Sequence, residues 1–89
     1  MKTILHRGDH DPDSRPISWR DEDVARFRRV LGANRVYVDE RDSQCLVIEA
    51  RRLYGPAIIE RIISPEEMLR ICLRTSFGFS WELKKKGKR

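Results

Sequence analysis

The stretch RVYVDERDSQCLVIEAR, residues 35–51, predicts the centre of the fold. Two runs rich in β-branched and aromatic residues, 35–40 and 45–51, flank four polar residues suited to a tight turn, as in a β-hairpin. A three-residue loop centred on Asp42 sets aliphatic residues opposite one another, whereas a shift by one residue would set Val36 against Glu49. The expected pairs are Val38 with Leu46, Val36 with Ile48, and Arg35 with Glu49.

Helical patterns lie on both sides of this hairpin. Ser18 is suited to cap a helix over residues 18–31, in which acidic residues come first, arginines follow and Gly32 ends the helix. The sequence Ser64-Pro65-Glu66-Glu67 combines a capping box with proline at the first helical position, which predicts a second helix over residues 65–75. This helix is expected to bury Leu69, Cys72 and Leu73 and to expose Arg70 and Arg74.

Three further segments carry strand signals. Residues 77–83 alternate between large apolar and small or polar residues. Residues 57–63 hold four isoleucines in a pattern that suits a helix or a buried strand, and we favour the strand because β-branched residues predominate. Residues 2–7 are compatible with a short edge strand that turns Ile4 inward. The sequence therefore predicts one small α+β domain in the order α-β-β-β-α-β, with an additional N-terminal edge strand and a mainly antiparallel sheet on which two helices pack.

Length and charge limit the function. A chain of 89 residues suits one domain without a large internal cavity. Five of the 19 basic residues lie in the last six positions, so the rest of the chain carries 14 basic and 14 acidic residues and is neutral. We divide the chain into an N-terminal strand and flexible arm (1–17), an α+β domain (18–83) and a basic C-terminal tail (84–89).

The sequence also predicts where in the cell the protein is located. Its apolar runs are too short to span a bilayer, and the residues after Met1 lack the apolar stretch of a secretory signal, so we expect a cytoplasmic protein without membrane contact. Cys45 and Cys72 lie in separate apolar runs, which favours two buried thiols over a disulfide or a metal pair. Without a glycine-rich phosphate loop, no cofactor is expected.

The aromatic residues Phe77, Phe79 and Trp81 directly precede the basic tail. This arrangement suits bases stacked beside phosphate-binding lysines, or a core face followed by a solubilising tail. We favour the core because so short a chain needs its aromatic rings there. The candidate phosphate-binding residues are Lys84, Lys85, Lys86, Lys88, Arg89, Arg70, Arg74, Arg28 and Arg29.

Two other groups offer metal ligands. The first comprises His6, Asp9, His10, Asp11 and Asp13, within eight positions, although a solvated arm is the favoured interpretation. The second comprises Asp39, Glu49 and Arg51, which together with the element order resemble the core of PD-(D/E)xK nucleases. The resemblance implies a magnesium-dependent nuclease in which the two acids hold the metal. Val38 stands in place of the family's proline and Arg51 in place of its lysine, and arginine is a poor substitute because it does not deprotonate.

A compact fold without a catalytic set favours a non-enzymatic binding module of the bacterial or phage accessory kind. We expect it to act through protein–protein contacts as an inhibitor or adaptor, and self-association is compatible with this expectation. A nucleic-acid-binding protein that uses the tail and the exposed arginines is the first alternative. A degenerate nuclease is the second.

Overall fold

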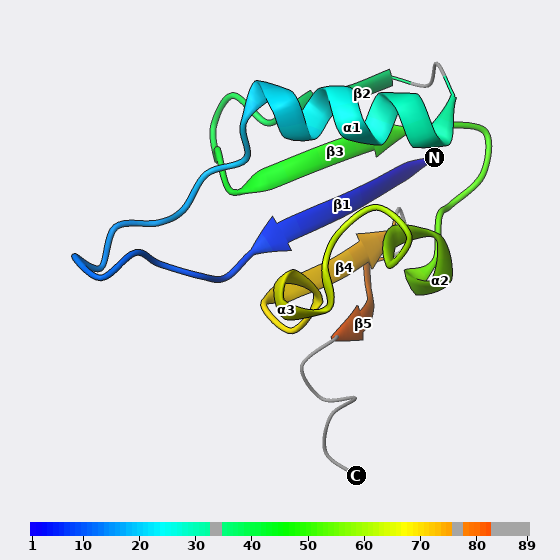
Figure 1. Cartoon of the computed structure of the whole chain (residues 1–89). Helices are drawn as coiled ribbons and strands as arrows, with labels where there is room; N and C mark the ends of the chain where they lie inside the picture. The colour runs from blue at the N-terminus through cyan, green and yellow to red at the C-terminus, as the bar shows by residue number, and fades with distance from the viewer. Residues whose placement is uncertain (33–34, 76–77, 83–89) are drawn as a thin grey trace, which may run out of the picture.

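The computed structural model describes residues 1–32, 35–75 and 78–82, the last five by their backbone alone. It combines helices with an antiparallel sheet and is therefore of the α+β class (Figure 1). Predictions for Phe77, for the side chains of Phe79 and Trp81, and for the tail at 84–89 lie outside the described residues. The elements are β1 (Lys2–Arg7), α1 (Asp21–Leu31), β2 (Arg35–Val38), β3 (Cys45–Glu49), α2 (Pro56–Ile59), α3 (Pro65–Met68), β4 (Ile71–Thr75) and β5 (Gly78–Glu82).

The five strands form one sheet in the order β2-β3-β1-β4-β5, and every neighbouring pair is antiparallel. The hairpin β2–β3 has the predicted register, with Val36 opposite Ile48. The prediction of an edge strand at residues 2–7 is wrong, because β1 lies between β3 and β4. The residue of β1 that faces the core is Leu5 rather than Ile4. Leu5 is fully buried and lies opposite Leu46 in β3 and Leu73 in β4.

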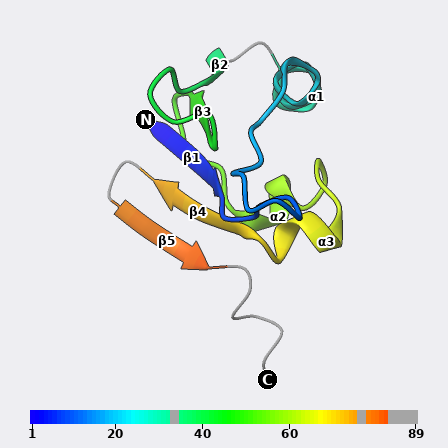
Figure 2. The same ribbon diagram turned by 90° about the vertical axis from the view of Figure 1, so that its left-hand side faces the viewer.

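The helices all cover one face of the sheet, and the core lies between these two layers (Figure 2). Phe27 of α1 and Ile59 of α2 are buried against Leu5, Ile48 and other sheet residues of this face. No described helix covers the opposite face, which we call the uncovered face. Its described residues are Lys2, Ile4, His6, Arg35, Tyr37, Cys45, Val47, Glu49, Cys72 and Arg74, as the registers and the strand alternation require.

The first helix begins later than predicted. α1 begins at Asp21, because the backbone N–H of Trp19 donates to the carbonyl of Ser43 and keeps the preceding chain extended. Ser18, the expected cap, instead shares a hydrogen bond with the Ser43 hydroxyl. The helix ends at Gly32 as predicted, with a φ of 74° that favours glycine.

Residues 57–63 were wrongly predicted as a strand. Pro56 occupies the first position of α2, and this short helix and the turn after it bury Ile59, Ile62 and Ile63 on one side. The predicted element order accordingly departs from the structure after β3, because two short helices, rather than a strand and one helix, separate β3 from β4. The additional N-terminal strand before α1 is present as β1.

The second predicted helix, over residues 65–75, is much shorter in the structure. Ser64 caps α3 as expected, accepting the backbone N–H of Glu67 at 3.2 Å, but the helix ends at Met68. Residues 71–75 form β4, which pairs with β1 and so adds backbone hydrogen bonds across the sheet. Leu69 is consequently 52% exposed, whereas Leu73 is buried as predicted. The described part of the chain therefore contains three helices rather than the two that were predicted.

Arg7 closes one end of the core. Its guanidinium donates twice to Asp9, from Nε to Oδ1 at 3.0 Å and from Nη2 to Oδ2 at 2.8 Å, and once to Glu67 at 3.2 Å. The same guanidinium lies 4.9 Å from the centre of the Trp19 ring. The indole N–H of Trp19 in turn donates to two backbone carbonyls, those of Leu5 and Gln44. The cluster thereby connects β1, α3 and the segment at 8–17.

Candidate binding groove between α1 and β2

β2 lies at the edge of the sheet, so one of its sides faces no further strand among the residues that the structure describes. The backbone N–H of Asp39 donates to the carbonyl of Cys45 in the partner strand. Because the direction of backbone polar groups alternates along a strand, the N–H and C=O groups of Val36 and Val38 point away from β3. This edge therefore presents backbone groups that a further extended chain can pair with.

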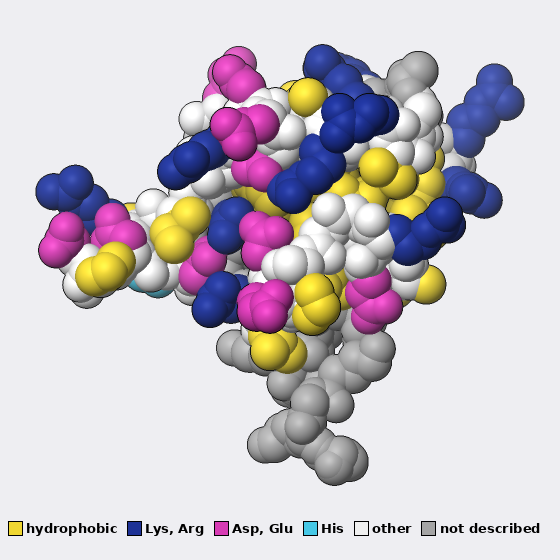
Figure 3. Space-filling view, in the orientation of Figure 1, with side chains coloured by type: hydrophobic (Ala, Val, Ile, Leu, Met, Phe, Trp, Pro, Cys, Tyr) yellow, Lys and Arg dark blue, Asp and Glu magenta, His cyan; other side chains and the backbone are white. Residues whose placement is uncertain are grey.

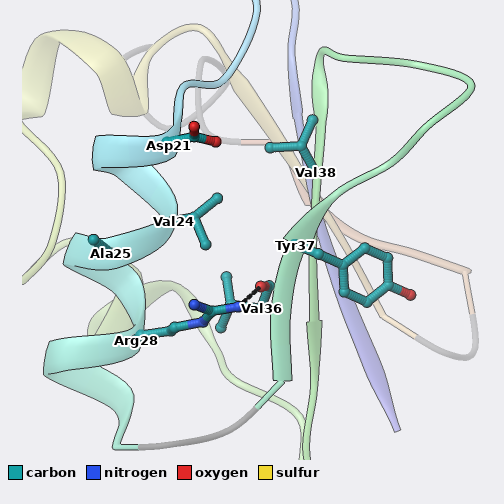
Figure 4. A pocket seen from close by; sticks show the side chains of 7 residues that line it. All are labelled: Asp21, Val24, Ala25, Arg28, Val36, Tyr37 and Val38. Atoms are coloured by element: carbon teal, nitrogen blue, oxygen red, sulfur yellow. Dashed lines mark hydrogen bonds between the residues drawn. The ribbon is translucent and has the colours of Figure 1, made fainter.

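A groove of about 370 Å³ lies between this edge strand and α1. Figure 4 shows Val24 pointing from α1 toward Val36 and Val38, with Asp21 at one end and Arg28 at the other. Tyr37 points away from the groove, toward the uncovered face of the sheet. The residues that line it are Asp21, Val24, Ala25, Arg28, Val36, Tyr37 and Val38.

Arg28 reaches across the groove to the edge strand. Its Nη2 donates to the backbone carbonyl of Val36 at 3.1 Å, so one outward group of the edge is already satisfied (Figure 4). A charged side chain that covers an edge strand in this way hinders indiscriminate pairing with other chains. A carbonyl oxygen nevertheless has two lone pairs, so it can accept from a second donor.

The helix gives the groove a charge gradient. α1 carries Asp21, Glu22 and Asp23 in its first turn and Arg28 and Arg29 in its last. Figure 3 shows acidic side chains over the beginning of α1 and basic ones over its second half. Both groups are stabilised by the helix dipole, and they leave the groove negative at one end and positive at the other.

The residues proposed for a nuclease do not converge. Asp39 follows the end of β2 beside Cys45, four positions along β3 from Glu49, which is roughly 13 Å. Glu49 accepts the Tyr37 hydroxyl at 2.7 Å and pairs with Arg35 at 3.2 Å, and the Tyr37 hydrogen bond is the main reason that the pKa of Glu49 is lowered. The Arg35 pair is the one predicted from the sequence.

The five candidate ligands near the N-terminus are also dispersed. His6 lies on the uncovered face, whereas Asp9 lies on the helical side, where its hydrogen bonds with Arg7 hold the pKa of its carboxyl below its usual range. Asp11 instead closes a turn by accepting two backbone N–H groups through Oδ1. His10 and Asp13 are exposed.

The described arginines of the predicted phosphate-binding set occupy different surfaces. Arg28 and Arg29 lie on α1, which covers one face of the sheet. Arg74 follows the buried Leu73 in β4 and therefore lies on the opposite face. Arg70 lies between α3 and β4. These side chains do not form one continuous basic surface.

Sequence reasoning missed the groove, although the helix and the hairpin that form its two sides were both predicted. Nothing local indicates that β2, rather than β1, lies at the edge of the sheet, because strand order depends on pairings between distant segments.

The fold and groove together define a small α+β protein with an accessible edge strand. None of its described helices has the length and apolar character needed to cross a membrane. Comparisons with protein-family models, curated proteins and solved structures found no match to the chain.

Proposed function

We propose that the chain is a non-enzymatic protein-binding module, an inhibitor or adaptor, that takes an extended segment of a partner protein into the groove between α1 and β2. The observation that supports this proposal is the edge strand whose outward backbone groups border an aliphatic groove. In this mode of recognition, main-chain hydrogen bonds supply affinity, and alternate side chains of the added strand supply specificity.

The groove also suggests the chemistry of the segment. Asp21 and Arg28 are seven positions apart on α1, roughly 10 Å along the helix axis, which is about three residues of extended chain. A fitting segment carries an aliphatic side chain toward Val24, a basic side chain toward Asp21 and an acidic one toward Arg28. β2, the edge strand with which the segment would pair, has only four residues. We therefore expect the groove to recognise about four to five residues of the partner segment.

Charge reversal at one position of α1 tests whether the partner segment binds in the groove. Arg28→Glu places a carboxylate where the segment's acidic side chain is expected, whereas Arg29→Glu makes the same charge change one position along the helix, outside the groove lining. Ala25→Trp is a second variant, because Ala25 is an exposed residue of the groove lining and a large ring there adds bulk where the partner segment is expected.

The assay compares proteins captured from a nuclease-treated lysate by the immobilised chain and by each variant. We expect a protein that wild type and Arg29→Glu retain, and that Arg28→Glu and Ala25→Trp lose. A protein retained equally by all four chains binds elsewhere, and the groove is then not the interface.

The nucleic-acid alternative is tested with the same chains and labelled DNA and RNA at two salt concentrations. Binding that weakens steeply with salt and is lost on deletion of residues 84–89 would favour the tail as a phosphate-binding segment over the proposal made here.

A further inference from the structure

Three side chains of different chemistry meet at one end of the uncovered face. His6 in β1 lies directly opposite Cys45 in β3, and Asp42 belongs to the turn that precedes β3. Nε2 of His6 and Sγ of Cys45 each lie 3.5 Å from Oδ2 of Asp42. The three possible ligand atoms all lie within 4.8 Å of one another.

These separations suit a tetrahedral metal ion. Zinc binds histidine nitrogen and carboxylate oxygen at about 2.0–2.2 Å and thiolate sulfur at about 2.3 Å, so neighbouring ligand atoms around it are about 3.3–3.8 Å apart. Two of the three separations in this cluster already have that length. Binding further requires the ligand atoms of His6 and Cys45, which lie within 4.8 Å of each other, to reach the same range.

The backbone holds the cluster in place. Oδ1 of Asp42 accepts the N–H of Gln44 at 3.0 Å, which leaves Oδ2 directed at the other two side chains. The N–H of Cys45 donates to the carbonyl of Asp42 at 2.9 Å, and this turn presents both residues together. His6 is fixed by its place in the central strand. Such support of the ligands from outside the site is typical of metal centres in proteins.

We propose that His6, Asp42 and Cys45 form a binding site for a divalent transition metal of the zinc type. Nitrogen and sulfur donors select such a metal over magnesium or calcium, which prefer oxygen. The side chains of His6 and Asp42 are 32% and 46% exposed, so a fourth position is open to water or to an external ligand. Binding replaces the proton of the Cys45 thiol, which is released to solvent.

The experiment uses the full chain, freed of metal by a chelator. Cobalt(II) is titrated first, because a thiolate ligand produces a charge-transfer absorption that histidine and carboxylate do not, and zinc is then added in competition. We expect one cobalt ion per chain, displacement by one zinc ion, loss of the absorption in Cys45→Ser and an affinity at least tenfold weaker in His6→Asn, since each removes one of three ligands.

The chain provides a matched control for each variant. Cys72→Ser removes the other thiol of the uncovered face, one strand away from His6, and His10→Asn removes the other histidine. Both are expected to bind as wild type does. The proposal is overturned if wild type shows no saturable binding, if Cys45→Ser keeps the absorption, or if Cys72→Ser or His10→Asn loses it. If circular dichroism shows that Cys45→Ser is unfolded, Asp42→Asn, in an exposed turn, is titrated instead. The site predicts a cobalt affinity at least tenfold weaker than that of wild type, and an unchanged affinity overturns the proposal.

Discussion

Removing the charge of Asp9 tests how the N-terminal segment is held to the core. The side chains of Arg7 and Asp9 are only 11% and 9% exposed, and two hydrogen bonds join them. Breaking a buried ion pair by removing one partner costs about 3–5 kcal/mol. Because Glu67 still faces Arg7 at 3.2 Å, we expect Asp9→Asn to lower the free energy of unfolding by somewhat less, about 2–3 kcal/mol.

Urea unfolding measures this loss. With an m value of about 1 kcal/mol/M for so small a domain, the midpoint should fall by about 2–3 M. Asp13→Asn, an exposed carboxylate in the same segment, is the control and should leave the midpoint nearly unchanged. If Asp9→Asn shifts the midpoint no more than Asp13→Asn does, the pair does not stabilise the fold as argued here.

The same pair predicts a dependence on pH. Arg7 lowers the pKa of Asp9 in the folded state below the value of about 3.9 expected in the unfolded chain. The stabilisation is therefore complete above the unfolded pKa and is lost as the pH falls through the folded pKa. The stability difference between wild type and Asp9→Asn should shrink on acidification from pH 5 toward about pH 2. A difference that stays constant over this range would contradict the assignment.

Four further substitutions have defined outcomes. Trp19→Phe removes the indole donor from the carbonyls of Leu5 and Gln44, of which the second still accepts the N–H of Arg7, and should cost about 1 kcal/mol in urea unfolding. Gly32→Ala, at a φ of 74°, should cost about 1 kcal/mol, and Gly55→Ala, at a φ of −93°, should cost less by the same measure. Tyr37→Phe removes the main cause of the lowered Glu49 pKa, so an NMR titration should show this pKa rising toward its ordinary value.

Local patterns predict those parts of the fold that depend on neighbouring residues. The register of the hairpin follows from its alternation, and the cap at Ser64 and the glycine at position 32 follow from backbone geometry. The segment after Met68 was wrongly predicted because its residues suit either a helix or a strand, and pairing with β1 decided between them. Nothing near residues 2–7 in the sequence indicates that this strand is central.

The candidate sites were less predictable, because they too depend on contacts between segments that are far apart in the sequence. Asp9 was recognised as a candidate ligand and its partner Arg7 is only two positions away, but Trp19 and Glu67, which surround the Arg7 guanidinium, come from other parts of the chain. His6 was recognised within an acidic segment, yet the residues beside it, Asp42 and Cys45, come from a hairpin far along the chain. Composition therefore identified reactive side chains, and only the order of strands determined which of them meet.

The most direct test of the central claim is photo-crosslinking from within the groove. A photoreactive amino acid replaces Ala25, which lines the groove and is exposed, and in a matched chain it replaces Arg29, outside the lining. We predict that the Ala25 position forms a discrete adduct with one protein, through a segment with an aliphatic residue between basic and acidic ones, and that the Arg29 position does not. Adducts of equal yield from both positions, or adducts with nucleic acid alone, would contradict it.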